Sequence, residues 1–201
     1  MKILLLFCLS MCIGNDIATD AWKLQKNSDQ IQIYNHRYLE TNFKEYRAVM
    51  QVKTSIQACV NLLKNDTLAK QWITRSKEFK TIQVISPKEW FTYAEIALPF
   101  PFQNRDLISH NILVEDTQNN TIKVELYSVP NFLPEKTDKV RMKNSKGFWL
   151  FKQISAQETE ITYQFFSEPA VPLPLWFVEP FIVNGLHTTL EKMREKLVVK
   201  F

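Results

Sequence analysis

Glycine is scarce in this chain, which has 3 glycines in 201 residues. So few glycines leave little room for a glycine-built phosphate loop, and the GxxxxGK[ST] pattern is absent. The GxSxG, HExxH and CxxC patterns are absent too. The sequence thus offers no familiar template for a nucleotide site, a serine nucleophile, a zinc hydrolase or a thiol-redox centre. We therefore expect no cofactor and no metal.

Cysteine is equally rare, and two of the 3 cysteines lie near the N-terminus in a segment with the features of an export signal. Lys2 supplies a short positive region, Ile3 to Ile13 is almost wholly apolar, and Gly14 offers a small residue for cleavage. The apolar run is too short to span a bilayer as a helix. We therefore predict a signal peptide over residues 1–14 and an exported protein, periplasmic or extracellular, with membrane association as an option.

Removal of that segment would leave Cys59 as the remaining cysteine, so no intramolecular disulfide could form. Loss of Lys2 would lower the formal net charge from +4 to +3, which is too weak to indicate a nucleic-acid partner. The full sequence has 45% hydrophobic and 23% charged residues, an ordinary globular balance, and we expect residues 20–201 to form one domain held by its core. We expect a monomer.

Periodicity divides this domain into a strand-rich body and a helical end. We expect a short helical lead-in over residues 20–27 and then two strands, 31–37 and 43–52. Thr54 and Ser55 are placed to cap a helix that begins at Ile56, and a second short helix is expected over 66–73. Short polar turns separate seven further expected strands, which we interpret as one antiparallel meander: 79–85, 90–98, 106–114, 121–129, 139–143, 148–154 and 160–166.

A long amphipathic helix is expected from Leu175 to Leu197, where apolar residues recur about every 3.6 positions. The meander sheet is the surface available to cover its apolar face. The fold class is therefore α+β, with one curved antiparallel sheet and one long helix. Such curvature tends to leave an apolar cavity between helix and sheet.

The stretch from Leu98 to Val114 combines a Pro/Phe corner with an Arg-Asp pair and a strand. Arg105 and Asp106 are adjacent on extended backbone, so their side chains should point to opposite faces of the sheet and cannot easily pair. Glu95 lies on an apolar strand face, and Arg141 lies in another strand. Either they are solvated strand charges or they act as polar anchors for a ligand head.

The chain resembles the START domain, the steroidogenic-acute-regulatory-related lipid transfer family, over nearly its full mature length. The order and spacing of short motifs carry this resemblance: Ile31-Gln-Ile-Tyr34, Glu45-Tyr-Arg47, Asn104-Arg-Asp106, Gly147-Phe-Trp149 and Pro174-Leu-Trp176. It implies a helix-grip fold, in which a curved sheet folds round a long C-terminal helix and encloses one lipid or sterol. It also implies binding and transfer, without covalent chemistry.

The sequence departs from the family pattern at an internal acid–base pair that some members carry. Glu95 could match the acid, but Asn111 and its neighbours occupy the place where the base is expected. Ala170 replaces a common glycine after Glu168-Pro169, and the export signal resembles bacterial members.

Each candidate lipid-binding residue could either line the cavity or pack in the hydrophobic core. The ones we select are Tyr93, Glu95, Tyr127, Arg141, Trp149, Phe165, Ile182, Leu186 and Leu190. Phe132 and Leu133 lie between two prolines, where turn chemistry does not explain apolar residues. We expect them to form a gate that, with residues 173–177, opens at a membrane; the alternative is that this loop folds back onto the sheet.

Three functions are consistent with these patterns. The first is a lipid or sterol carrier that contacts membranes transiently. The second is an enzyme acting on a hydrophobic molecule in the same cavity. Glu95 and His110 are the candidate acid and base for such an enzyme, and the sequence gives them little support. The third is an interaction module with a filled core. Of these, we favour the carrier.

Overall fold

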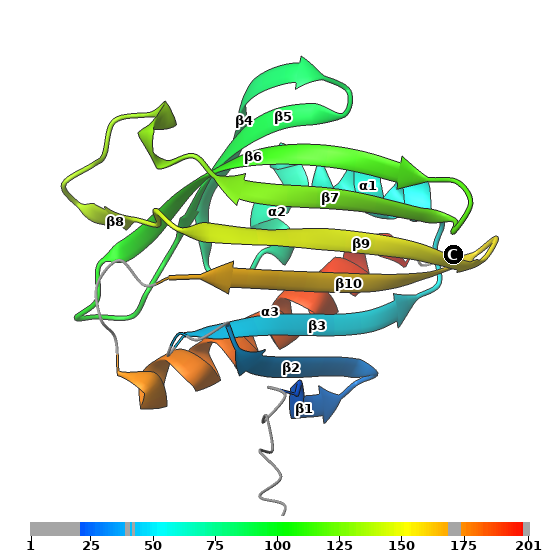
Figure 1. The fold of residues 1–201 in the computed structure, drawn as a ribbon, viewed down its shortest axis with the longest axis horizontal. Coiled ribbons are helices and arrows are strands. Elements are labelled where there is room, and N and C mark those ends of the chain that lie inside the picture. The colour runs from blue at the N-terminus through cyan, green and yellow to red at the C-terminus, as the bar shows by residue number, and fades with distance from the viewer. Residues whose placement is uncertain (1–20, 39–40, 42, 169–173, 199–201) are drawn as a thin grey trace, which may run out of the picture.

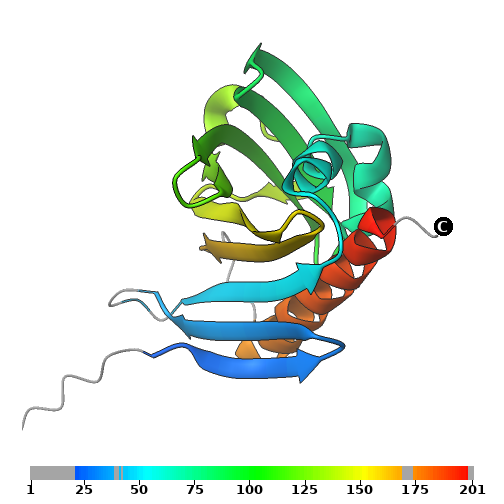
Figure 2. The ribbon, with the colours of Figure 1, turned by 90° about the vertical axis from the view of Figure 1, so that its right-hand side faces the viewer.

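The computed structural model describes residues 21–38, 41, 43–168 and 174–198. In this part of the chain a 10-stranded sheet curves around a C-terminal helix (Figures 1 and 2). The expected curved antiparallel sheet with one long C-terminal helix is confirmed. The elements are β1 (Lys23–Ser28), β2 (Ile31–Arg37), β3 (Lys44–Val52), α1 (Ile56–Leu63), α2 (Asp66–Trp72), β4 (Ser76–Ser86), β5 (Glu89–Ile96), β6 (Asn104–Asp116), β7 (Thr121–Ser128), a 3-10 turn (Pro130–Phe132), β8 (Lys139–Arg141), β9 (Ser145–Ser155), β10 (Glu158–Ser167) and α3 (Leu175–Leu197).

The predicted lead-in helix is wrong, because β1 is a strand that pairs antiparallel with β2. Its connection is a tight turn in which Asp29 and Gln30 have φ values of 54° and 60°. Two consecutive left-handed residues match the twist of a hairpin. Pairing with β2 therefore overrides the local helical pattern of the segment.

The predicted antiparallel meander is present except for one strand. The strand order of the sheet is β1-β2-β3-β10-β9-β7-β6-β5-β4, so β4, β5, β6, β7, β9 and β10 follow one another as predicted, and β10 also pairs with β3. The expected meander strand β8 lies off this path and pairs parallel with the start of β6 (Figure 1). Strands β1 and β4 are left as the two edges.

The three helices lie against the concave side of the sheet (Figure 2). The predicted cap is present, since the Ser55 side chain accepts a hydrogen bond from the Ala58 N–H. Helix α3 packs on α1, α2, β2 and β3. Its C-terminal half supplies the buried Leu190, Met193 and Leu197 to the main core. None of the helices in the described residues is long and apolar enough to cross a membrane.

Candidate functional site: the cavity between α3 and the sheet

A cavity of about 640 Å³ lies between the N-terminal half of α3 and the concave face of the sheet. This volume is within the range typical of sites for one small molecule. Its wall is mainly aromatic and aliphatic, and side chains from α2, β3, β5, β6, β9, β10 and α3 all contribute to it. It is therefore built by the tertiary fold rather than by one local motif.

Stacked aromatic rings form one side of the cavity. Trp149 on β9 stacks on Tyr163 of β10 with ring centroids 4.1 Å apart, and Tyr163 stacks on Phe165 at 5.3 Å. Tyr46 of β3 extends the row, 5.8 Å from Phe165. Burial raises the pKa of the Tyr163 hydroxyl to about 12, so this group stays neutral and acts as part of an apolar wall.

Four of the predicted lipid-binding residues line this cavity: Trp149, Phe165, Ile182 and Leu186. Leu190 does not line it, because it lies further along α3 and is 1% exposed in the main core. Tyr46 and Tyr163 line the wall but were missed by the sequence analysis. Their strand alternation with neighbouring polar residues could have identified them.

The prediction that Tyr93 and Glu95 of β5 face the cavity requires a correction. Trp90, Thr92 and Ala94 line the cavity, so Tyr93 and Glu95 lie on the opposite, outer face. Tyr93 is nevertheless only 1% exposed, and its hydroxyl has no hydrogen-bond partner within the described part of the chain. Glu95 binds Lys139 of β8 and accepts a hydrogen bond from Asn104 at 2.7 Å.

Tyr127 and Arg141 are also outside the cavity lining. Tyr127 is 44% exposed and donates a hydrogen bond to Glu125. The Arg141 side chain is buried in a two-point ion pair with Asp106, and it also donates to the backbone carbonyls of Pro130, Leu133 and Pro134. Arg141 therefore fixes the loop between β7 and β8 to the outer face.

The predicted gate residues lie in that same loop. Phe132 stacks on Phe91 of the outer face with ring centroids 4.6 Å apart. Neither Phe132 nor Leu133 lines the cavity. The loop thus folds back onto the sheet, which was the alternative arrangement considered from the sequence.

Arg105 and Asp106 point to opposite faces, as the sequence indicated. Arg105 lines the cavity, whereas Asp106 is 1% exposed beneath the β7–β8 loop. The preceding residue, Asn104, holds the Pro/Phe corner, because its side-chain oxygen accepts a hydrogen bond from the Leu98 N–H at 3.3 Å. The corner therefore depends on Asn104 more directly than on the charged pair.

A group of neutral polar side chains is set into the cavity wall on β5 and β6. The Asn111 amide nitrogen lies 3.1 Å from the Thr92 hydroxyl and from the carbonyls of Trp90 and Ser109, and it shares its two N–H donors among these three acceptors. Thr92, Ser109 and Asn111 all line the cavity. Neutral hydrogen-bonding groups thus stand where the family resemblance suggested an acid–base pair, and Glu95 is not part of them.

The Pro/Phe corner and the start of α3 meet at one end of the cavity. Phe102 of the corner packs on Phe177 of α3, with ring centroids 4.8 Å apart, and Phe177 and Leu98 both line the cavity. Beside this contact, Phe100 is 97% exposed and Trp176 is 77% exposed. Two large aromatic side chains at this end are thus left in solvent.

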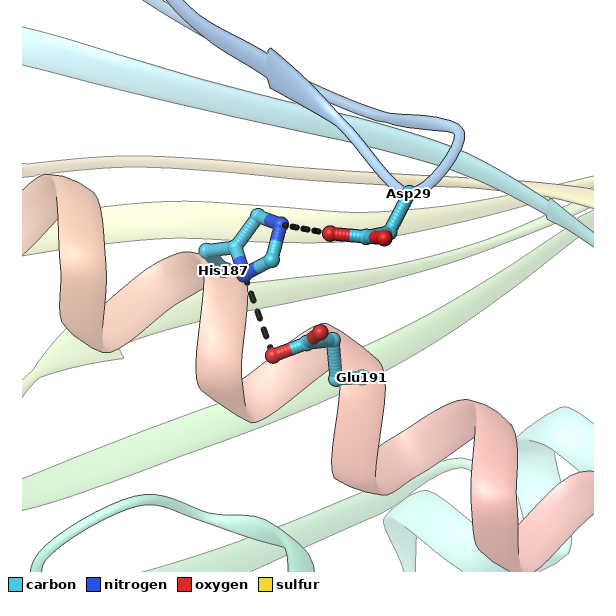
Figure 3. A group of neighbouring side chains, drawn as sticks. All are labelled: Asp29, His187 and Glu191. Carbon is cyan, nitrogen blue, oxygen red and sulfur yellow. Dashed lines mark ion pairs between the residues drawn. The ribbon is translucent and has the colours of Figure 1, made fainter.

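A second group of polar side chains lies where α3 meets the β1–β2 turn (Figure 3), and none of its three residues lines the cavity. His187 of α3 is placed between Asp29 of the β1–β2 turn, 3.4 Å from its Nε2, and Glu191, 3.1 Å from its Nδ1. These three residues could offer metal ligands. The two carboxylates face opposite ring nitrogens, however. A metal ion bound to one ring nitrogen would therefore be near one carboxylate and away from the other in this arrangement. The arrangement suits a hydrogen-bonded brace between α3 and the hairpin.

Comparisons with known proteins agree with this architecture. The family model described as the START domain matches residues 14–198. A Pseudomonas aeruginosa protein described as uncharacterized is 30% identical over 182 residues, which cover 90% of this chain and 88% of the relative. The phosphatidylcholine transfer protein of Mus musculus is 24% identical over 181 residues, with 86% and 81% covered. The crystal structure of a STAR-related lipid transfer protein from Xanthomonas axonopodis superposes with a TM-score of 0.80 at 25% identity, covering 89% of this chain and 99% of that one.

Proposed function

This chain belongs to the START domain family, and we propose that it binds one lipid or sterol molecule in the cavity under α3 and carries it between membranes or to a partner. The observation that carries the proposal is the cavity itself. Its wall is mainly apolar, with a group of neutral polar side chains and a few charged ones, so it can take up a hydrophobic chain or ring system. Each buried methylene contributes about 0.8 kcal/mol, so apolar burial alone can give useful affinity.

The enzyme alternative has no comparable support. Its two candidate residues lie outside the cavity lining: Glu95 binds Lys139, and His110 is 2.8 Å from Glu89 and stacks on Phe91. These are structural contacts of the outer face. The START relatives named above are described as lipid transfer proteins where a function is given.

Exchange of a lipid requires the cavity to open, and we assign this role to the Pro/Phe corner and the start of α3. Phe102 and Phe177 form the contact that would have to separate. The exposed Phe100 and Trp176 beside it fit transient insertion into a membrane interface, where aromatic side chains are favoured. The β7–β8 loop with Phe132 and Leu133 is less suited to opening, since Arg141 binds three of its carbonyls.

We also propose that the protein is exported and acts as a monomer in the periplasm or outside the cell. The predicted signal peptide, residues 1–14, lies outside the described residues. Measurement of the mass of the mature chain from its native host would test cleavage near Gly14.

Lipid extraction combined with native mass spectrometry tests the binding function. The purified full chain should retain one lipid per protein, and the delipidated chain should take up one lipid from donor liposomes and release it to acceptors. A delipidated, folded protein that acquires no lipid from liposomes of any composition tested would contradict the proposal and favour the interaction module.

A further inference from the structure

The cavity wall carries more positive than negative charge. Among its described lining residues, Lys44, Arg75, Arg105 and Lys146 are basic and Glu168 is acidic. Lys44 is paired with Glu179, and Glu168 accepts a hydrogen bond from Asn144 at 2.8 Å. The two arginines form no ion pair with any described carboxylate.

Arg105 uses little of its hydrogen-bonding capacity. A guanidinium has five N–H donors, and the hydrogen bond found here runs from Nη1 to the Gln103 carbonyl at 3.2 Å. Burial lowers the pKa of this guanidinium from its ordinary value, and no neighbouring acid offsets that effect. A half-buried cation without an anion is costly, so this position favours a negatively charged partner.

Arg75 is close to Arg105 through the sheet. Its carbonyl accepts a hydrogen bond from the Ala97 N–H, and the next residue, Ser76, pairs with Ile96, which in turn pairs with Arg105. One strand therefore separates the two arginines, which places their Cα atoms on the order of 10 Å apart. The Arg75 guanidinium lies 4.1 Å from the centre of the Phe181 ring, which also lines the cavity.

Thr74, the residue before Arg75, also lines the cavity, and its buried hydroxyl has no hydrogen-bond partner among the described residues. Its N–H donates to the Thr189 hydroxyl, so Thr74 lies further along α3 than the contact of Arg75 with Phe181. The exposed Arg75 guanidinium has no acceptor among the described residues, and Arg105 has the Gln103 carbonyl alone. An oxyanion can accept from both guanidinium groups, and arginine binds carboxylates and phosphates through two parallel hydrogen bonds.

From this we infer that Arg75 and Arg105 bind an anionic headgroup, so that the ligand is a lipid carrying a carboxylate or a phosphate. The inference rests on the proposed lipid-binding function and specifies the ligand class of the same cavity. The headgroup lies near the Pro/Phe corner, and the apolar part of the ligand extends along Trp149 and Leu186.

Ligands with the same hydrocarbon chain and different headgroups measure the contribution of the headgroup to binding. Delipidated protein is titrated with oleate, with oleoyl lysophosphatidate and with oleyl alcohol, which share the same hydrocarbon chain but differ in headgroup. Binding is followed by the fluorescence of Trp72 and Trp149, which both line the cavity. The wild-type protein should bind at least one of the anions about 10-fold or more tightly than the alcohol. Comparison of oleate with lysophosphatidate shows whether a carboxylate or a phosphate is preferred.

Matched variants identify the residues. Arg75→Gln and Arg105→Gln should each weaken binding of the preferred anion about 10-fold and leave oleyl alcohol unchanged. Lys152→Gln, which removes a positive charge from an exposed position on β9 outside the cavity lining, should change neither affinity. Equal wild-type affinities for anions and alcohol, or arginine variants with unchanged preference, would overturn the headgroup inference while lipid binding stands. Failure of the folded protein to bind all three ligands would overturn both proposals.

Discussion

The guanidinium of Arg141 binds the carboxylate of Asp106 at two points, with N–O distances of 2.9 Å and 3.0 Å, on the side of the sheet opposite the cavity. Both side chains are 1% exposed. The pair joins β8 to β6, and the remaining donors of Arg141 bind the loop carbonyls above it. This buried and fully hydrogen-bonded pair thus belongs to the outer face of the sheet and not to the cavity.

Replacement of Arg141 should destabilise the fold strongly. Arg141→Met leaves the Asp106 carboxylate buried and unpaired, which costs about 3–5 kcal/mol. Urea unfolding measures this loss. Lys88→Met, in the exposed pair with Glu115, should cost less than about 1 kcal/mol. The double variant Arg141→Met with Asp106→Leu should recover part of the loss; equal costs for the buried and the exposed pair would contradict this assignment.

A larger side chain on the cavity wall should block lipid uptake without unfolding the protein. Ala94 lines the cavity, so Ala94→Phe places a ring in the space that the lipid would occupy. Lipid retained per protein should fall several-fold by native mass spectrometry, while the circular dichroism spectrum stays unchanged. Lys152→Phe adds the same ring outside the cavity and should retain wild-type loading. Full loading of folded Ala94→Phe would show that the ligand lies elsewhere.

Charges at the Pro/Phe corner should slow lipid exchange. Phe100→Asp with Trp176→Asp removes the exposed aromatic side chains, so liposome-to-liposome transfer should slow by about 10-fold while equilibrium binding is retained. Val84→Asp with Ile85→Asp is the matched control, since these two residues of β4 are 65% and 53% exposed and lie outside the cavity lining.

The same assay compares the two candidate gates. Phe132→Asp should affect exchange less than the corner variant, because Phe132 packs on Phe91 of the outer face. A transfer rate that depends on the residues of the β7–β8 loop, and not on those of the corner, would show that the β7–β8 loop is the gate.

Acid should remove the contribution of Glu95 to stability. The hydrogen bond from Lys139, and then that from Asn104, lower the pKa of the Glu95 carboxyl from its ordinary value of 4.5. A depressed folded-state pKa gives stability that is present above the pKa of the unfolded state and is lost as pH falls through the folded one. Wild type and Glu95→Gln should thus differ most near neutral pH, and the difference should shrink as the pH falls below the ordinary carboxyl pKa of 4.5 and through the lowered folded-state pKa.

Urea unfolding over a pH series measures that convergence. Lys139→Met should flatten the same acid limb, because it removes the main cause of the lowered pKa. A constant difference between wild type and Glu95→Gln down to the acid limit would show that the Glu95 contacts act through packing rather than charge.

Several elements could be predicted from the sequence because their signals are local. The β2 and β3 strands, the Ser55 cap and the long α3 helix follow from alternation, from a capping residue and from a 3.6-residue period. The opposite directions of Arg105 and Asp106 follow from extended backbone alone. The β1 strand does not, since its conformation depends on pairing with β2.

The cavity face of β5 could not be chosen from the sequence because both of its faces are covered. The inner face carries Trp90 and Thr92, and the outer face carries Phe91 and the buried Tyr93 beneath the β7–β8 loop. Alternation separates two faces but does not say which one meets α3. Tyr93 was therefore predicted to line the cavity because its strand face is apolar, although that face is the outer one. The polar Asn111, which was not selected, lines the cavity.

By itself the sequence determined the fold class, the long helix and the family motifs, because these depend on local periodicity and on residue order along the chain. The tertiary structure alone decided that Arg141 closes on Asp106, that Glu95 pairs with Lys139, and that Arg75 and Arg105 lie one strand apart at the cavity. Arg141 meets Asp106, and Lys139 meets Glu95, because β8 returns to the start of β6 beside β5. Arg75 and Arg105 lie near each other because β5 runs between β4, which Arg75 precedes, and β6.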